Sequence, residues 1–143
     1  MKDRHFNYIK DLTRYERQKT WEVTVGGCPV GGNNPIRIQT MTDTDTKDTD
    51  AIIEQIISLI KAGADYVRVT VKGIYDAENI RNVKRELVAR GYNTPLIGDI
   101  HFNPKLAEIA AKYISKVRIT PGNFYDKRAQ FKNKIYTYEE YKN

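Results

Sequence analysis

Three stretches of the chain alternate between aliphatic and polar positions with the two-residue period of a β-strand. They cover residues 66–71, 96–101 and 116–120. Side chains of a strand point alternately to its two faces, so one face of each stretch is aliphatic. The opposite face carries polar residues: Arg68, Thr70, Asp99, His101, Arg118 and Thr120. Buried parallel strands are normally aliphatic on both faces. The pattern therefore predicts strands whose polar faces converge on one site.

Helical spacing separates these strands. Five isoleucines between Asp48, a good N-cap, and Gly63, a good helix end, fall on one helical face: Ile52, Ile53, Ile56, Ile57 and Ile60. A second helix is predicted over about residues 76–90 and a third over 106–113. The strand–helix rhythm repeats at the size of a βαβ unit, which predicts parallel strands.

The fold class expected from this rhythm is α/β, with about four parallel βα units over residues 36–123, the first strand at 36–41, preceded by a β-hairpin at 20–35. A full TIM-type (β/α) barrel needs about 250 residues, so we expect a partial barrel. Residues 1–19 form a lead-in arm without a clean period, and residues 124–143 a tail without a further strand. The hairpin turns at Gly26-Gly27 and is expected to plug one end of the barrel.

Composition narrows the function classes. The net charge is +6, but Lys and Arg are scattered, which favours a solvated surface over a nucleic-acid-binding face. Cys28 is the only cysteine, so no thiolate cluster arises from this chain, and no metal site and no catalytic residue is assigned. No apolar run approaches the ~20 residues that cross a bilayer. A cytoplasmic protein without a membrane partner is the simplest expectation.

Arg68, His101 and Arg118 stand at or near the carboxyl ends of successive strands, where α/β sheets bind ligands. Guanidinium groups suit phosphate because they stay charged and donate in pairs. The alternative is structural, with Arg68 paired to Asp99 and His101 a satisfied core residue. Three such residues on one side favour a site. The loop 42–46 offers acids and hydroxyls that suit a metal, substrate hydroxyls or helix caps equally well.

Two further features belong to the same strand ends. Gln39 and Met41 end the first predicted strand. Residues 121–123, Pro-Gly-Asn, are predicted to form a turn that offers backbone N–H groups, with the Asn123 side chain available to a ligand.

Four blocks at these positions carry a family resemblance: residues 35–42, 63–70, 99–102 and 118–123. In order and spacing they resemble the amino-terminal barrel of the 4-hydroxy-3-methylbut-2-en-1-yl diphosphate synthases, over about residues 19–131. Residues 123–131 look like the longer, three-domain form found in plants and some bacteria. The resemblance implies an iron–sulfur oxidoreductase of non-mevalonate isoprenoid biosynthesis. Its substrate is 2-C-methyl-D-erythritol 2,4-cyclodiphosphate, its cofactor a [4Fe-4S] cluster, and its electron donor ferredoxin or flavodoxin.

The same resemblance implies roles for single residues. Arg68, His101, Arg118 and Asn123 would hold the substrate's phosphates, and Gln39 and Met41 would line the same mouth. Thr120 departs from the family pattern, which often has Asn there. In the family a carboxyl-terminal domain holds the cluster on three cysteines and a glutamate, and none of that set is expected here. We therefore expect a truncated form of the enzyme, inactive by itself.

Two other readings remain open: a barrel similar to dihydropteroate synthase, and a basic module that binds RNA or an acidic partner. The half-barrel also predicts unpaired strand edges, and with them a homodimer or larger assembly. The aliphatic faces are expected to pack against the helices through eight residues: Ile36, Ile38, Val67, Val69, Leu96, Ile100, Val117 and Ile119.

Overall fold

The computed structural model describes residues 13–14, 19–125, 137–138 and 140. A short antiparallel hairpin, β1 (Val23–Val25) and β2 (Cys28–Val30), precedes a parallel sheet of four strands. The sheet strands are β3 (Gln39–Met41), β4 (Tyr66–Thr70), β5 (Leu96–Ile100) and β6 (Lys116–Ile119). Between them run α1 (Thr49–Lys61), α2 (Ile74–Ala89) and α3 (Pro104–Ala110), and α4 (Pro121–Tyr125) follows β6. The predicted α/β class, hairpin first and parallel βα units after it, is confirmed.

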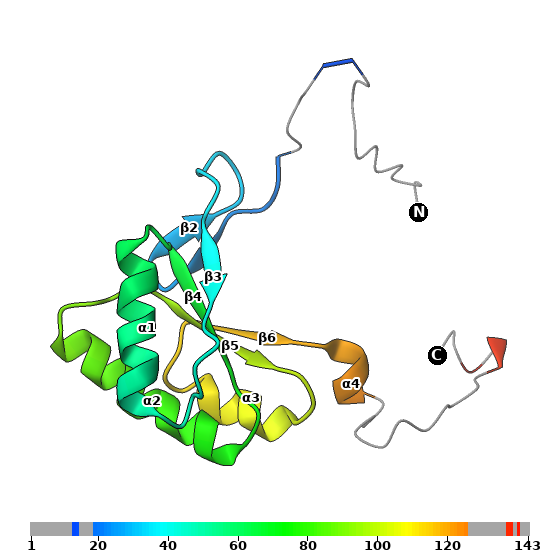
Figure 1. Cartoon of the computed structure of the whole chain (residues 1–143). Coiled ribbons are helices and arrows are strands. Elements are labelled where there is room, and N and C mark those ends of the chain that lie inside the picture. Colours follow the sequence, from blue (N-terminus) through cyan, green and yellow to red (C-terminus); the bar gives the residue numbers. More distant parts are fainter. Residues whose placement is uncertain (1–12, 15–18, 126–136, 139, 141–143) are drawn as a thin grey trace.

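The strands lie in the sheet in their order along the chain, β3-β4-β5-β6, and all pair in parallel. The helices α1, α2 and α3 cover one side of the sheet (Figure 1). Local chemistry sets the ends of these helices. The Asp48 carboxylate accepts a hydrogen bond from Ala51 N at the start of α1, and the Asn103 side chain accepts from Lys105 N at the start of α3.

One core joins the helices to the aliphatic face of the sheet. Its largest members are fully buried side chains from α1, α2, β4 and β5: Ile52, Ile53, Ile56, Ile80, Val83, Leu87, Val67, Val69, Leu96 and Ile100. Val67, Val69, Leu96 and Ile100 thus face the helices as predicted, and Val117 is partly buried against the same core. Burial of these side chains places their polar neighbours in the strands on the opposite face.

The prediction fails for two of the eight residues, Ile36 and Ile38, and a third, Ile119, is on the helix face in register with Ile100 but is incompletely covered. Ile36, Ile38 and Ile119 are 78%, 60% and 41% exposed. The first sheet strand begins only at Gln39, three residues later than expected, so Ile36 and Ile38 precede it. Ile119 ends β6, which like β3 is an edge of the sheet and is less covered by helices.

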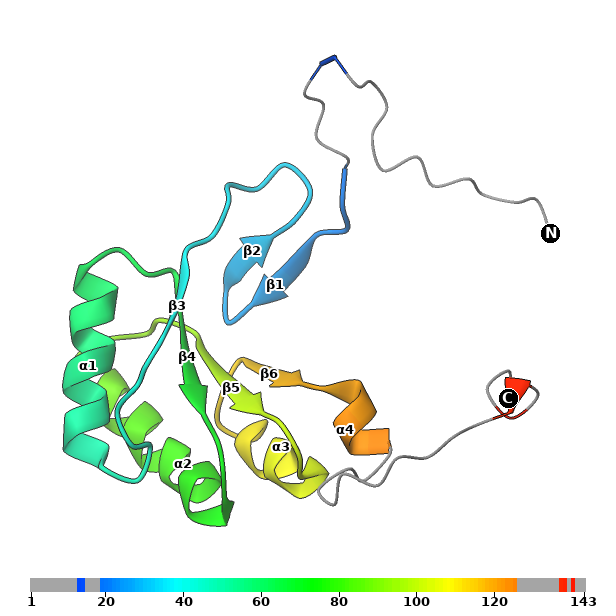
Figure 2. The same ribbon diagram turned by 45° about the vertical axis from the view of Figure 1, so that its right-hand side comes forward.

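The hairpin packs at the amino ends of the sheet strands, away from α4 (Figure 2). Tyr66 Oη donates to Cys28 O at 3.1 Å, and Arg37 Nε donates to Pro29 O at 3.0 Å. Gly26 has a φ of 55°, and a Cβ there would lie 2.5 Å from Ser115 Oγ. The turn therefore needs glycine both for its left-handed backbone and for its close approach to the segment before β6.

The predicted turn at residues 121–123 is wrong, because these residues begin helix α4. Asn123 N donates to Thr120 O at 3.0 Å, and Phe124 N donates to the same oxygen at 3.3 Å. Proline suits the first position of a helix, where its missing N–H costs nothing. The predictions for the arm at 1–19 and the tail at 124–143 fall largely outside the described residues. In the described part, no helix is long and apolar enough to span a membrane.

Candidate anion-binding site

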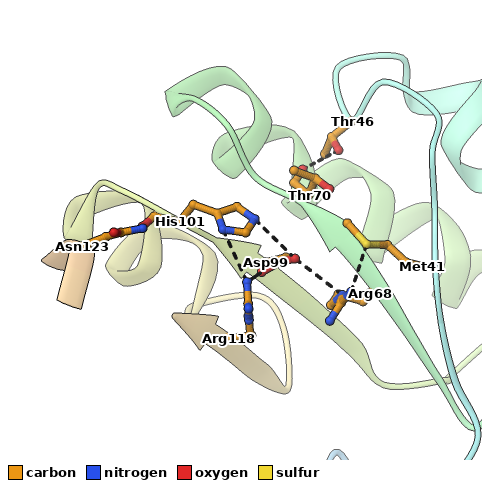
Figure 3. Close-up of polar contacts among 8 residues, drawn as sticks. All are labelled: Met41, Thr46, Arg68, Thr70, Asp99, His101, Arg118 and Asn123. Carbon is orange, nitrogen blue, oxygen red and sulfur yellow. Dashed lines mark hydrogen bonds and ion pairs between the residues drawn. The ribbon is translucent and has the colours of Figure 1, made fainter. Parts of the chain in front are cut away.

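Polar side chains from neighbouring strands meet at the carboxyl edge of the sheet, on the face away from the helices. Met41 of β3 is in register with Arg68 of β4, and Asp99 of β5 is in register with Arg118 of β6. His101 directly follows β5. Because registered neighbours in a parallel sheet share a face, these side chains point into one space. Figure 3 shows them grouped around Asp99.

Asp99 is the centre of the group and is only 2% exposed. Its Oδ1 accepts a hydrogen bond from Arg118 Nη1 at 2.8 Å. Its Oδ2 lies 3.5 Å from Arg68 Nε and 3.6 Å from His101 Nε2. Arg118 Nη1 also lies 3.4 Å from His101 Nδ1. One buried carboxylate therefore holds three potential cations from three consecutive strands together.

The group has more positive than negative charge and is open to a ligand. Two arginines against one carboxylate leave an excess of one positive charge with His101 neutral. The side chains of Arg118 and His101 are 44% and 40% exposed, and that of Arg68 is 29% exposed. This arrangement favours an anion, whose oxygens would accept charge-assisted hydrogen bonds from both guanidinium groups.

Arg68 in particular has donor capacity left over. Its Nε has no hydrogen-bond partner among the described residues, although Asp99 Oδ2 is close. Its Nη2 donates to Met41 Sδ at 3.2 Å, and a thioether sulfur is a weak acceptor. A partly exposed guanidinium held by so few acceptors is suited to take an incoming oxyanion.

The remaining predicted site residues lie at different distances from this centre. Asn123 is beside it, since its Nδ2 donates to His101 O at 3.0 Å and so links α4 to the end of β5. Gln39 is at the other end of β3. It lines a separate hollow of about 370 Å³ together with Tyr66, Ile97 and residues of the hairpin. The structure thus brings Met41, Arg68, His101, Arg118 and Asn123 together but not Gln39.

Asp99 is the residue that sequence reasoning missed as part of the site. The alternation places it on the converging polar faces, but it is named there only as a possible structural partner of Arg68 and not as a ligand-binding residue, whereas the structure pairs it with Arg118 at the shortest distance. The available signal was its position. It is the one acidic residue among the six polar positions on the inward faces of the three alternating strands.

A chain of parallel βα units with a cationic group at the carboxyl edge of its strands is typical of the (β/α)-barrel class, whose members bind ligands at that edge. Comparison with known proteins agrees. Residues 20–142 match the family model described as the GcpE TIM-barrel domain. The chain belongs to this family, and the partial TIM-type fold predicted from the sequence is confirmed.

Two curated relatives carry the same synthase name. The chain is 52% identical over 131 residues to a protein of Phocaeicola vulgatus named 4-hydroxy-3-methylbut-2-en-1-yl diphosphate synthase (flavodoxin), covering 92% of this chain and 21% of the relative. It is 44% identical over 134 residues to the chloroplastic enzyme of Oryza sativa, named with ferredoxin, covering 94% of this chain and 18% of the relative. The chain thus spans about a fifth of the length of the curated relatives it matches.

A solved structure with a similar fold is the dihydropteroate synthase of Xanthomonas albilineans, with a TM-score of 0.54 over 71% of this chain and 41% of that one. At 17% identity this similarity concerns the fold alone.

Proposed function

We propose that this chain is the diphosphate-binding part of a 4-hydroxy-3-methylbut-2-en-1-yl diphosphate synthase. The whole enzyme would reductively convert 2-C-methyl-D-erythritol 2,4-cyclodiphosphate to 4-hydroxy-3-methylbut-2-enyl diphosphate. The observation that carries the proposal is the group around Asp99. Two arginines and a histidine from three strands meet at the ligand-binding edge, in a chain about half identical to enzymes of that name.

Each residue of the group would have a distinct task. Arg68 and Arg118 would bind the phosphate oxygens, because both are charged and partly exposed. His101 would donate a further hydrogen bond, and Asn123 would hold the end of β5 through its bond to the His101 carbonyl. Met41 would form the wall next to Arg68. The resemblance assigns Gln39 to the same ligand-binding opening. Because Gln39 is at the other end of β3, it would contact a substrate only from there.

The cluster implied by the family does not fit the residues present. A [4Fe-4S] cluster needs several thiolates, whereas the chain has one cysteine, Cys28, in the hairpin at the opposite end of the strands from the anion-binding group. In the whole protein, we propose, the cluster is held outside these 143 residues, the electrons come from flavodoxin or ferredoxin, and these residues alone are inactive.

The edges of the sheet bear on the assembly of the protein. Strands β3 and β6 are the two edges of the four-stranded sheet, and unpaired edges are templates for another strand. We propose that this chain forms a homodimer or larger assembly through these edges. We further propose that it works in the cytoplasm, and that the hairpin and the βα units form one unit. Light scattering coupled to size exclusion tests the assembly, and a species of 16.6 kDa at every concentration would contradict it.

The two other functional readings are less well supported. The similarity to dihydropteroate synthase extends to the fold only. An RNA-binding or acidic-partner module is disfavoured because the cations of the site surround a buried carboxylate and do not form an exposed stripe.

Calorimetric titration with inorganic diphosphate and with the cyclic diphosphate tests the anion site directly. Arg118→Ala removes a charge-assisted contact worth about 1.5–3 kcal/mol, so affinity should fall about tenfold or more. Arg81→Ala is the matched control, because Arg81 is an exposed arginine of α2, which packs on the other side of the sheet. An unchanged affinity of Arg118→Ala, or an equal fall in the control, would remove Arg118 from the site. With the whole cluster-loaded enzyme and reduced flavodoxin, Arg118→Ala should lower turnover of the cyclic diphosphate.

A further inference from the structure

The hollow of about 370 Å³ lies between the hairpin and the inward face of the sheet, at the opposite end of the strands from the anion-binding group (Figure 2). Its volume is in the lower part of the range of small-molecule sites, about 300–1,000 Å³. None of the residues that line it takes part in the contacts around Asp99. We call it the hairpin pocket, and its lining includes Val25, Val30, Ile36, Gln39, Ile97 and Lys116.

Aliphatic and aromatic side chains form the floor and one wall of the hairpin pocket. The floor is made by Tyr66 of β4 and Ile97 of β5, which are 5% and 1% exposed. The wall is made by Val25 and Val30 of the two hairpin strands. They point to the same side, because Val30 is in register with Val23, two residues before Val25. This part of the pocket suits a hydrocarbon chain.

The mouth of the hairpin pocket exposes further apolar surface. Ile36 lines the pocket and is 78% exposed, and Val23, on the same face of the hairpin as Val25, is 58% exposed. The segment that carries Ile36 is tied to the hairpin, since Arg37 Nε donates to Pro29 O at 3.0 Å. A ligand that covers this surface removes apolar area from water and gains affinity.

The polar groups give the hairpin pocket a positive charge. Arg37 and Lys116 both line it, and no carboxylate is among the described residues that do. Asp65 offsets Arg37, whose Nη1 lies 3.4 Å from Asp65 Oδ1. Lys116 is exposed and forms no ion pair with any residue of the described part. It is in register with Ile97, so its side chain leaves the sheet on the face of the apolar floor.

One free cation beside an apolar wall selects a class of ligand. A pure hydrocarbon would cover Lys116 without pairing its charge, which costs free energy. A small inorganic anion would leave the apolar wall in water. A monocarboxylate with a short apolar chain meets both demands, because its single charge matches Lys116 and its chain covers Val25, Val30 and Ile36. The Gln39 side chain, which also lines the pocket, can donate to the second carboxylate oxygen.

We propose that the hairpin pocket is a second ligand site, which binds a small monocarboxylate with its head at Lys116 and its apolar chain against the hairpin. This site goes beyond the proposed function, whose ligand places its phosphates at Arg68 and Arg118. A ligand in the hairpin pocket would contact both the hairpin and β6, and would therefore stabilise the packing of the hairpin on the sheet.

The test titrates the full 143-residue chain with three probes and follows the backbone amide signals by NMR. Hexanoate carries the carboxylate and the chain, acetate carries the carboxylate with a single methyl group, and 1-hexanol carries the chain without the charge. Hexanoate should bind about tenfold more tightly than either of the others, because it alone satisfies both parts of the pocket. The shifted signals should be those of the hairpin, Ile97 and Lys116.

Two substitutions separate the head from the chain. Lys116→Met removes the charge and keeps an apolar side chain, so hexanoate should bind about tenfold more weakly while the affinity for 1-hexanol stays unchanged. Ile36→Ser should weaken hexanoate severalfold and leave acetate unchanged. Lys112→Met is the matched control, because Lys112 is an exposed lysine that follows α3 and does not line the pocket. It should bind hexanoate as the wild type does.

Several outcomes would overturn the proposal. They are hexanoate binding no tighter than acetate, wild-type affinity in Lys116→Met, an equal fall in Lys112→Met, and shifts centred on Arg68 and Arg118. If Lys116→Met does not fold, Ile36→Ser decides, and its retention of wild-type affinity for hexanoate overturns the pocket. Inorganic diphosphate should bind Lys116→Met as it binds the wild type, so that failure of the hairpin pocket and failure of the anion site are distinguishable.

Discussion

Replacement of Asp99 by Asn tests the central contact of the site. Asp99 is buried, and its partners Arg68 and Arg118 are 29% and 44% exposed. A charge-assisted hydrogen bond contributes about 1.5–3 kcal/mol when buried. Solvent screening at the half-exposed Arg118 and the longer 3.5 Å contact to Arg68 reduce the sum. We expect Asp99→Asn to lower the free energy of unfolding by about 2 kcal/mol.

The same substitution should make the site more receptive to an anion. Without the carboxylate the two arginines leave two positive charges where there was one in excess. Two unit charges roughly 8 Å apart interact with about 2 kcal/mol at an effective dielectric constant near 20. In the wild type these two charges are the Asp99 carboxylate and a bound phosphate, which repel each other. Partial exposure of the site should halve that repulsion. Saturating diphosphate should therefore stabilise Asp99→Asn by about 1 kcal/mol more than it stabilises the wild type.

Urea unfolding with and without diphosphate measures both effects, and Asp65→Asn is the control. Asp65 pairs with Arg37 at 3.4 Å and accepts from Ile38 N at 2.8 Å, at the amino end of β4. Loss of the Asp65 carboxylate should also destabilise the chain, but diphosphate should stabilise Asp65→Asn only as much as it stabilises the wild type. The reasoning is refuted if Asp99→Asn is as stable as the wild type, or if it gains less from diphosphate than the wild type does.

Three further substitutions test the fold. Burial raises the pKa of the Tyr66 hydroxyl above its ordinary 10.0, so the folded state keeps its proton when the unfolded state loses it, and wild-type stability should fall as pH rises above about 10. Tyr66→Phe loses the hydrogen bond to Cys28 O and should be about 1 kcal/mol less stable than the wild type at pH 8. It should also lack the alkaline decline in stability. Urea unfolding that shows the same decline for the two proteins at high pH would contradict this prediction. Gly26→Ala should lower the thermal midpoint, since its Cβ would clash with Ser115 Oγ, and an unchanged midpoint would contradict this packing. Leu87→Ala, at a 1% exposed core position, should cost about 2–5 kcal/mol in chemical denaturation, and a loss below 1 kcal/mol would place Leu87 outside the core.

Periodicity predicted the elements well where burial is complete. β4 and β5 have full helix cover on their aliphatic faces, and their alternation was read correctly at Val67, Val69, Leu96 and Ile100. At the sheet edges the same alternation misled, because Ile36 and Ile38 lie before β3 and remain exposed. A local pattern identifies which side chains share a face, but it does not reveal whether another element covers that face.

The candidate site was predictable in its location and not in its centre. The positions of Arg68, His101 and Arg118 at strand ends followed from alternation alone. The pairing of Asp99 with Arg118 depends on the register between β5 and β6, which is a property of the folded sheet. The helix at Pro121 was missed because Pro-Gly is the chemistry of turns, and proline also suits the first residue of a helix.

The strand order has a consequence for how the site forms. Spatial neighbours in the sheet are also consecutive in the chain, so each pairing closes a single strand–helix–strand connection. The contact order is therefore low for a parallel sheet. During synthesis, which proceeds from the amino end, β5 reaches β4 before β6 exists. Arg68 and Asp99 then form a pair without net charge. The proposed site becomes cationic only when β6 delivers Arg118, so any affinity for anions would arise when β6 pairs with β5.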